Sequence, residues 1–279
     1  SHRCWISNNC ITPKKMFLYA QLQLFVSSKG DFWVKKILGN KLTYKPVEED
    51  VKGSNTFGFN SSKTKDGSTY LAINTHQPLD GPTSWYEVHL CSEQGTDIIG
   101  ALFAGSPNIL IGANRNIAWA HTVNQPDKTD VFKLEMHPNK KRFYRVDDQY
   151  LQLKKHKAKI IVKVLGIPLK VSKKYFESIY GPTLENDSGF YSVRTPSLFE
   201  AKALEQWWRM NKAESFSEFY SILKMKALPG YNIGYADKND TLFYISNGLI
   251  PKRAPGYEWA NVVPGNTKKT LWTSTYDIE

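Results

Sequence analysis

The fold is decided between residues 70 and 136, where the chain reads, in order, YLAIN (70–74), YEVHL (86–90), IIGALF (98–103), IAWAH (117–121) and VFKLEM (131–136). Each run has the length of a β-strand, and the runs are rich in the apolar residues that strands bury. Turn signals separate them, such as Asp80-Gly81-Pro82 and Ser106-Pro107-Asn108. Short strands in quick succession predict a predominantly antiparallel β region.

More strand signals follow along the chain. A turn at Gly166 is expected to join two of the runs, because glycine between apolar stretches is a typical turn signal. The further strands are predicted at 150–157, 158–164, 168–171, 232–236 and 241–246.

Two helices are predicted between these strand groups. Ser197 is expected to cap a helix over 198–210, and Ser215 with Glu218 forms a capping box before a helix over 219–227. Helices beside strand pairs favour an α+β layered architecture over a parallel βαβ one.

The composition is that of a folded globular protein. Among the 279 residues, 41% are hydrophobic and 23% are charged, and the formal net charge is +11. The lysines thicken between Lys154 and Lys174, where they alternate with apolar residues. This alternation favours the wet face of a half-buried sheet over a nucleic-acid-binding patch.

Residues 1 to 53 read differently from the rest of the chain. They hold one apolar segment, 17–26, followed by a charged stretch, 45–50, which is interpreted as an exposed linker. No apolar run approaches the length of a membrane-spanning helix, so no membrane span is predicted. The three cysteines, Cys4, Cys10 and Cys91, show neither a disulfide framework nor a zinc-ligand spacing.

The most specific signal begins at the junction of the linker and the β-rich region. Several short segments occur in a fixed order along most of the chain, and their strength lies in this order. They are Gly53-Ser54-Asn55, Asn74-Thr75-His76-Gln77-Pro78, residues 117–123 (IAWAHTV), residues 178–182 (SIYGP), Tyr231-Asn232 and Ala236-Asp237. In this order they resemble the penicillin acylase family of N-terminal-nucleophile hydrolases, near its acyl-homoserine-lactone acylase branch.

The resemblance implies a four-layer αββα sandwich, incomplete in this fragment, and synthesis as a precursor that is cut between Gly53 and Ser54. Residues 1–53 would then be the end of the preceding chain or spacer. Residues 54–279 would be the N-terminal part of the nucleophile-bearing domain. Serine is a poor nucleophile without a base, and the new α-amine of Ser54, with a reference pKa of about 7.7 to 8.0, can be that base.

The resemblance also assigns roles to four other residues. The backbone N–H of Val123 and the side chain of Asn232 would form an oxyanion hole, which stabilises charge in the tetrahedral intermediate. His76 would hydrogen-bond the nucleophile region. Arg253 would hold Asn232 and the serine amine in place.

A calcium ion is possible by the same resemblance, although no cofactor is required. Asp127, Thr129 and Asp130 fall where some family members bind calcium, and carboxylates are its usual ligands. From the residues alone, the stretch also reads as an ordinary acidic turn.

The function implied is hydrolysis of a small N-acylated amide, such as a β-lactam, an acyl-homoserine lactone or an acylated amino acid. The expected partners are this substrate and the remaining acylase chain segments, in a heterodimer cut from one precursor. The family implies a periplasmic or secreted location. Gln77 departs from the aromatic residue that many relatives carry after the histidine, so the acyl preference stays open. The alternative is a noncatalytic binding or scaffold module.

Overall fold

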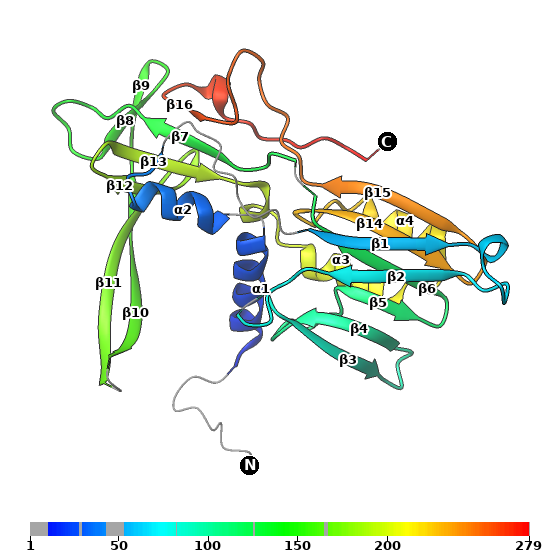
Figure 1. The fold of residues 1–279 in the computed structure, drawn as a ribbon. Helices are drawn as coiled ribbons and strands as arrows, with labels where there is room; N and C mark the ends of the chain where they lie inside the picture. The colour runs from blue at the N-terminus through cyan, green and yellow to red at the C-terminus, as the bar shows by residue number, and fades with distance from the viewer. Residues whose placement is uncertain are drawn as a thin grey trace.

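The computed structural model contains two six-stranded and two two-stranded β-sheets in the part of the chain that it describes. That part comprises residues 11–27, 30–42, 53–81, 83–124, 126–164 and 167–278. The linker expected at 45–50 and the turn expected at Gly166 lie outside the described residues. Figure 1 shows the two large sheets at opposite ends of the molecule, with the N-terminal helix α1 between them.

The first large sheet is antiparallel and has the strand order β15-β14-β6-β5-β4-β3. It confirms the antiparallel β region predicted from the sequence. Its strands are β3 (Trp85–Cys91), β4 (Asp97–Phe103), β5 (Ile111–Asn114), β6 (Ile117–Thr122), β14 (Gly230–Asp237) and β15 (Leu242–Gly248).

The two central strands of this sheet, β6 and β14, each have one face of large side chains and one face of small ones. Because strand side chains alternate, Trp119, Ile233 and Tyr235 share a face, and the small residues between them lie on the other. The large face forms the main hydrophobic core with the helices α3 (Ala203–Lys212) and α4 (Phe216–Leu223).

The small face is covered by a hairpin of β1 (Ser54–Phe59) and β2 (Tyr70–Thr75), with a short 3-10 helix at Ser61–Lys63 between its strands. The approach is close because a Cβ atom on Gly234 would lie only 3.0 Å from the Thr56 side chain. Glycine on β14 therefore lets the hairpin that begins at Ser54 lie directly against the sheet.

The second large sheet has the order β10-β11-β12-β13-β7-β16, in which β16 runs parallel to β7. Its core includes Phe132, stacked on Tyr180 at a centroid distance of 4.8 Å. Its strands are β7 (Asp130–Leu134), β10 (Lys154–Val164), β11 (Ile167–Ser178), β12 (Gly181–Asn186), β13 (Gly189–Arg194) and β16 (Val262–Gly265), and β8 (Phe143–Val146) pairs with β9 (Gln149–Gln152) beside it.

Two N-terminal helices connect the halves of the molecule. In α1 (Pro13–Ser27), the Gln23 amide donates to the Ala104 carbonyl after β4 at 3.0 Å. In α2 (Gly30–Leu38), the carbonyl of the fully buried Ile37 accepts a hydrogen bond from Asn186 on β12 at 2.9 Å. No helix among the described residues is long and apolar enough to cross a membrane.

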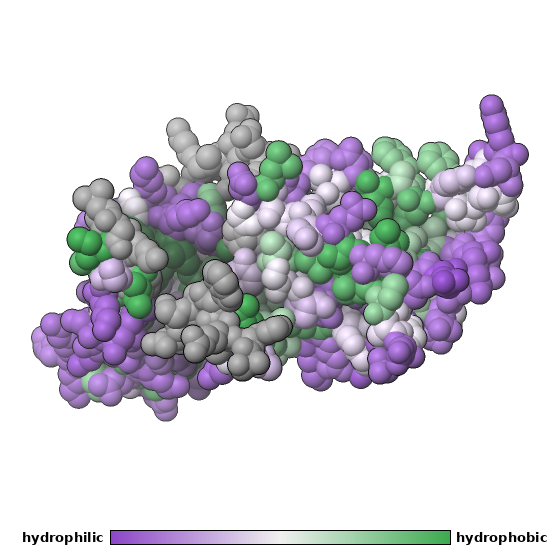
Figure 2. Space-filling view, turned by 90° about the horizontal axis from the view of Figure 1, so that it is seen from below, coloured by the Kyte–Doolittle hydropathy of each residue, from purple (hydrophilic) through white to green (hydrophobic). Residues whose placement is uncertain are grey.

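The lysine-rich segment forms the long hairpin β10–β11, which projects from the second sheet (Figure 1). Hydrophilic side chains gather over this end of the molecule in Figure 2. Strands were predicted here, but the predicted break between residues 157 and 158 was wrong, because β10 runs unbroken over Lys154–Val164. The expectation of a half-buried sheet was also wrong: Ile167 is 63% exposed and Val171 is 48% exposed. The arm extends beyond the sheet, so neither of its faces is covered there.

The helix predictions were correct in kind and partly wrong in their ends. Ser215 caps α4 as predicted, accepting from the Glu218 N–H at 3.3 Å, but the helix stops at Leu223 and the chain turns through the left-handed Lys226 (φ 50°). The expected Ser197 cap was wrong. Ser197 lies in a short 3-10 helix, Pro196–Leu198, and α3 begins only after Lys202.

Candidate active site

Ser54 is the first residue of β1 and lies opposite Thr75 on β2. Its hydroxyl donates to the carbonyl oxygen of Gly53 at 2.8 Å and accepts from the backbone N–H of His76 at 3.3 Å. A Cβ atom on Gly53 would lie 3.9 Å from Nδ1 of His76. The structure thus brings the predicted cleavage site and His76 together.

A small cavity opens beside Ser54 at the ends of β1 and β6. Its volume of about 20 Å³ is enough for roughly one water molecule. Thr122, the last residue of β6, and Val123, which follows it, form one wall. The other walls are largely aromatic. The aromatic lining comes from Trp85, Phe103, Trp207 and Tyr231.

Asn232 lies on the small face of the sheet, opposite Thr122. Its side-chain amide donates to the Thr122 hydroxyl at 3.2 Å and to the carbonyl oxygen of Val123 at 3.1 Å. Ser54 and Val123 therefore border one cavity, and Asn232 is hydrogen-bonded to two residues of its wall. The alternation of β14 explains the placement, because Asn232 shares its face with Gly234 and not with the large residues.

His121 is a buried residue of this region that the sequence analysis did not single out. Its Nε2 accepts a hydrogen bond from Trp207 Nε1 at 3.0 Å, and its ring lies 4.7 Å from that of Tyr231. Burial lowers the pKa of His121 to about 3, so the ring is neutral at physiological pH. The sequence could have predicted this burial, because His121 is two residues after Trp119 on β6 and therefore lies on the same, core-facing side of the strand.

Arg253 forms a second cluster, with two of the residues predicted for calcium. Its Nε lies 3.0 Å from Asp130 and its Nη1 lies 3.1 Å from Asp127. Trp272 donates to the same Asp130 oxygen at 2.6 Å. Burial raises the pKa of Asp130 to about 6, against the opposing effect of Arg253, and it also raises the pKa of Asp127. The hydrogen bonds of Arg253 thus go to the aspartates and not to Asn232.

These residues do not fit a calcium ion as they are arranged. Thr129 Oγ1 and one oxygen of Asp130 are buried and have no partner among the described residues. Their two carboxylates and one hydroxyl would supply only part of the six to eight oxygen ligands of calcium, which also come from backbone carbonyls and water. The Arg253 guanidinium already pairs with both carboxylates.

Comparison with known proteins gives a match over nearly the whole chain. The family model described as penicillin amidase matches residues 11–279. The acyl-homoserine lactone acylase PvdQ of Pseudomonas syringae pv. syringae (strain B728a) is 30% identical over 209 residues, which cover 72% of this chain and 27% of that protein. Aculeacin-A acylase of Actinoplanes utahensis is 27% identical over 208 residues, covering 72% of this chain and 26% of that protein.

A solved structure is similar in fold. The thermostable penicillin G acylase from Alcaligenes faecalis superposes with a TM-score of 0.66 at 22% identity, over 79% of this chain and 40% of that chain. This likeness confirms the expected α+β class as a mixed α and β fold. The chain spans 27% of the length of the PvdQ relatives that it matches.

Proposed function

The chain belongs to the penicillin amidase family, and on that premise we propose that it carries the nucleophile of a self-processing amidohydrolase. In this proposal Ser54 first cuts its own precursor and then cleaves the amide bond of a small N-acylated substrate. The observation that carries the proposal is the Ser54 hydroxyl, held between the Gly53 carbonyl and the His76 N–H at the edge of the cavity.

The processing step uses the contact between Ser54 and Gly53. Ser54 Oγ attacks the carbonyl carbon of Gly53, the Gly53–Ser54 C–N bond breaks, and the nitrogen takes up a proton as the hydroxyl loses one. Water then hydrolyses the ester, which restores the hydroxyl and leaves Gly53 as a carboxylate. The His76 N–H supports this step because it fixes the hydroxyl beside the carbonyl.

The same hydroxyl then serves the substrate. The freed α-amine of Ser54 takes the hydroxyl proton as Oγ attacks the acyl carbon, which gives a tetrahedral intermediate. The amide C–N bond then breaks, the leaving amine takes up that proton, and water hydrolyses the Ser54 ester to release the carboxylic acid. The Val123 N–H and the Asn232 amide would stabilise the oxyanion. The nitrogen of that amide donates to Thr122 and Val123 before cleavage, so Asn232 must turn to reach an oxyanion. To hold Asn232 in place, as the family resemblance implies, Arg253 would have to give up its contact with one aspartate and hydrogen-bond to Asn232 instead.

The substrate class follows from the family and from the cavity. The related proteins are named for acyl-homoserine lactone, aculeacin A and penicillin G. In this chain an apolar, aromatic wall suits an acyl group, with Gln77 as a polar group beside it. Because the cavity holds about one water molecule, binding of an acyl chain requires the wall to open.

The rest of the protein would complete the fold. Phe57 and Tyr70, on the β1–β2 hairpin, are 56% and 51% exposed, which is unusual for a pair of aromatic residues on one short sheet. We propose that later acylase segments extend this sheet and cover it with helices, which would make the four αββα layers, and that the cut before Ser54 makes the two chains of the heterodimer. Family membership supports a periplasmic or secreted location, which fractionation of the source cells would test.

The rival is a noncatalytic scaffold, favoured by the engagement of Arg253 with Asp127 and Asp130. Periodate tests the two directly, because it oxidises only a serine that has a free α-amine, to an aldehyde that an aminooxy dye labels. Mature protein that labels at Ser54, located by peptide mapping, and releases amines from acylated substrates supports the proposal. Protein that does not label at Ser54, and hydrolyses none of them, contradicts it.

A further inference from the structure

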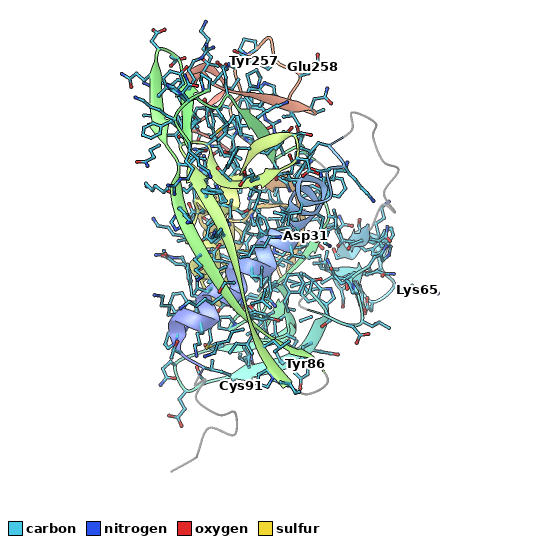
Figure 3. All side chains as sticks on the ribbon, turned by 90° about the vertical axis from the view of Figure 1, so that its left-hand side faces the viewer. Asp31, Lys65, Tyr86, Cys91, Tyr257 and Glu258 are labelled. Atoms are coloured by element: carbon cyan, nitrogen blue, oxygen red, sulfur yellow. The ribbon has the colours of Figure 1, made fainter. Side chains whose placement is uncertain are left out.

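A second cluster of reactive side chains lies on the edge hairpin β3–β4, at the end away from its Trp85–Phe103 pair. His89 and Cys91 are two residues apart on β3, so their side chains share one face. Asp97 lies directly opposite Cys91 on β4. Cys91 is exposed and is labelled in Figure 3.

Three different donor atoms meet at this point. His89 Nε2 lies 2.8 Å from Asp97 Oδ1 and 3.2 Å from Cys91 Sγ, and the sulfur lies 3.6 Å from the same carboxylate oxygen. Ligands of a tetrahedral zinc ion, with bonds of about 2.0 to 2.3 Å, lie roughly 3.3 to 3.5 Å apart. The three atoms are thus already near the corners of one face of such a tetrahedron.

The arrangement does not fit a nucleophile relay. In a thiol–imidazole–carboxylate relay, the two partners contact different nitrogens of the ring. Here the thiol and the carboxylate both contact Nε2 of His89. Donor atoms that converge on a single point fit a shared cation better than a chain of proton transfers.

The second oxygen of Asp97 is held by Arg115, whose Nε donates to it at 2.7 Å. Such outer contacts orient ligating carboxylates in metal sites. They also leave Oδ1 of Asp97 to face His89 and Cys91.

We propose that His89 Nε2, Cys91 Sγ and Asp97 Oδ1 bind one zinc-type divalent ion, with water in the fourth position. The mixed nitrogen, sulfur and oxygen donors match zinc and not a hard ion such as calcium or magnesium. Binding releases the thiol proton to solvent, since the thiolate is the ligand. No ligand spacing in the sequence marks this site, because strand pairing brings Asp97 to Cys91.

The ion would tie an edge strand to its neighbour. β3 is the last strand of its sheet, and the opposite end of the same hairpin lines the Ser54 cavity through Trp85 and Phe103. The metal would therefore stabilise a wall of the cavity without touching it. The inference does not depend on the proposed amidase activity.

The test is calorimetric titration of the intact chain with ZnCl₂, alongside Cys91→Ser, His89→Gln and Asp97→Asn. We expect one ion per chain with a dissociation constant on the order of micromolar or lower, weakened about tenfold or more in each variant. His137→Gln, at a half-buried histidine on a loop outside this cluster, is the control and keeps the affinity. Equal zinc affinity in wild type and all three ligand variants would overturn the proposal.

Cobalt gives a second readout that does not depend on affinity. Co²⁺ bound to a thiolate adds a charge-transfer absorption in the near ultraviolet, which we expect in a Cys4→Ser/Cys10→Ser background and not when Cys91→Ser is added. Zinc should also raise the melting temperature of that background, since an ion that binds only the folded state stabilises it. Absence of the band in the Cys91-containing protein contradicts the proposal even if a ligand variant fails to fold.

Discussion

The side-chain amide of Asn232 donates to the carbonyl oxygen of Val123 at 3.1 Å, although the two residues are 109 positions apart in the sequence. The contact follows from the pairing of β14 with β6, which sets Asn232 opposite Thr122. It places the Asn232 side chain beside Val123, whose N–H is the other group proposed for the oxyanion hole and which lines the cavity that Ser54 borders.

Asn232→Ala should lower kcat of the processed enzyme by about 100-fold to 1,000-fold, roughly 3 to 4 kcal/mol of barrier, because one oxyanion donor is lost. Steady-state hydrolysis of an acylated amine measures this. Asn74→Ala is the control, since Asn74 is exposed on β2, and it should keep the rate. A rate in Asn232→Ala equal to that of the control would show that this amide does not serve the oxyanion.

His121→Gln should reduce the acid sensitivity of the fold. The pKa of His121 in the folded state, about 3, lies below its ordinary value of about 6.5. Between these two pH values the unfolded state binds a proton at His121 and the folded state does not. This contribution to stability is present above pH 6.5 and is lost as the pH falls toward 3. Between pH 7 and pH 5 this effect lowers the free energy of unfolding by about 2 kcal/mol.

Urea unfolding at pH 7 and pH 5 measures the difference. Glutamine can still accept from Trp207 Nε1 but does not titrate. His137→Gln, at a histidine that is only half-buried, is the control and should keep the wild-type pH dependence. If His121→Gln loses as much stability on acidification as wild type does, His121 is not buried as a neutral ring.

Arg253→Met should destabilise the fold by about 3 to 5 kcal/mol, because it leaves the buried Asp130 and the neighbouring Asp127 without their cation. Arg209→Met is the control. Arg209 pairs with Glu205 one turn earlier on α3, and its side chain is 52% exposed, so its loss should cost less than about 1 kcal/mol. Equal unfolding midpoints for the two variants would contradict a structural role for the Arg253 cluster.

Local patterns predicted most strands of the first sheet and the Ser215 cap, because alternation and capping depend on residues close in sequence. The β10–β11 arm shows the limit: alternation predicted its strands, but only the tertiary structure shows that Ile167 and Val171 remain uncovered. Pattern alone also could not place the start of α3.

The candidate site divides in the same way. Ser54 and His76 were predicted from short motifs, and β1–β2 pairing brings them together. The bond between His121 and Trp207 joins residues 86 positions apart, and that between Arg253 and Asp130 joins residues 123 positions apart. Such pairs depend on which sheet faces and loops meet in the folded protein, and patterns of residues close in sequence do not predict those contacts.

The central claim is that Ser54 cuts the chain before itself. Intact mass and N-terminal sequencing of the full-length precursor, beside Ser54→Ala, test it most directly. The account predicts a new terminus beginning Ser54-Asn55-Thr56 in the wild type and an uncut chain in the variant. A wild-type precursor that stays whole, or a Ser54→Ala chain cut at the same bond, would contradict it.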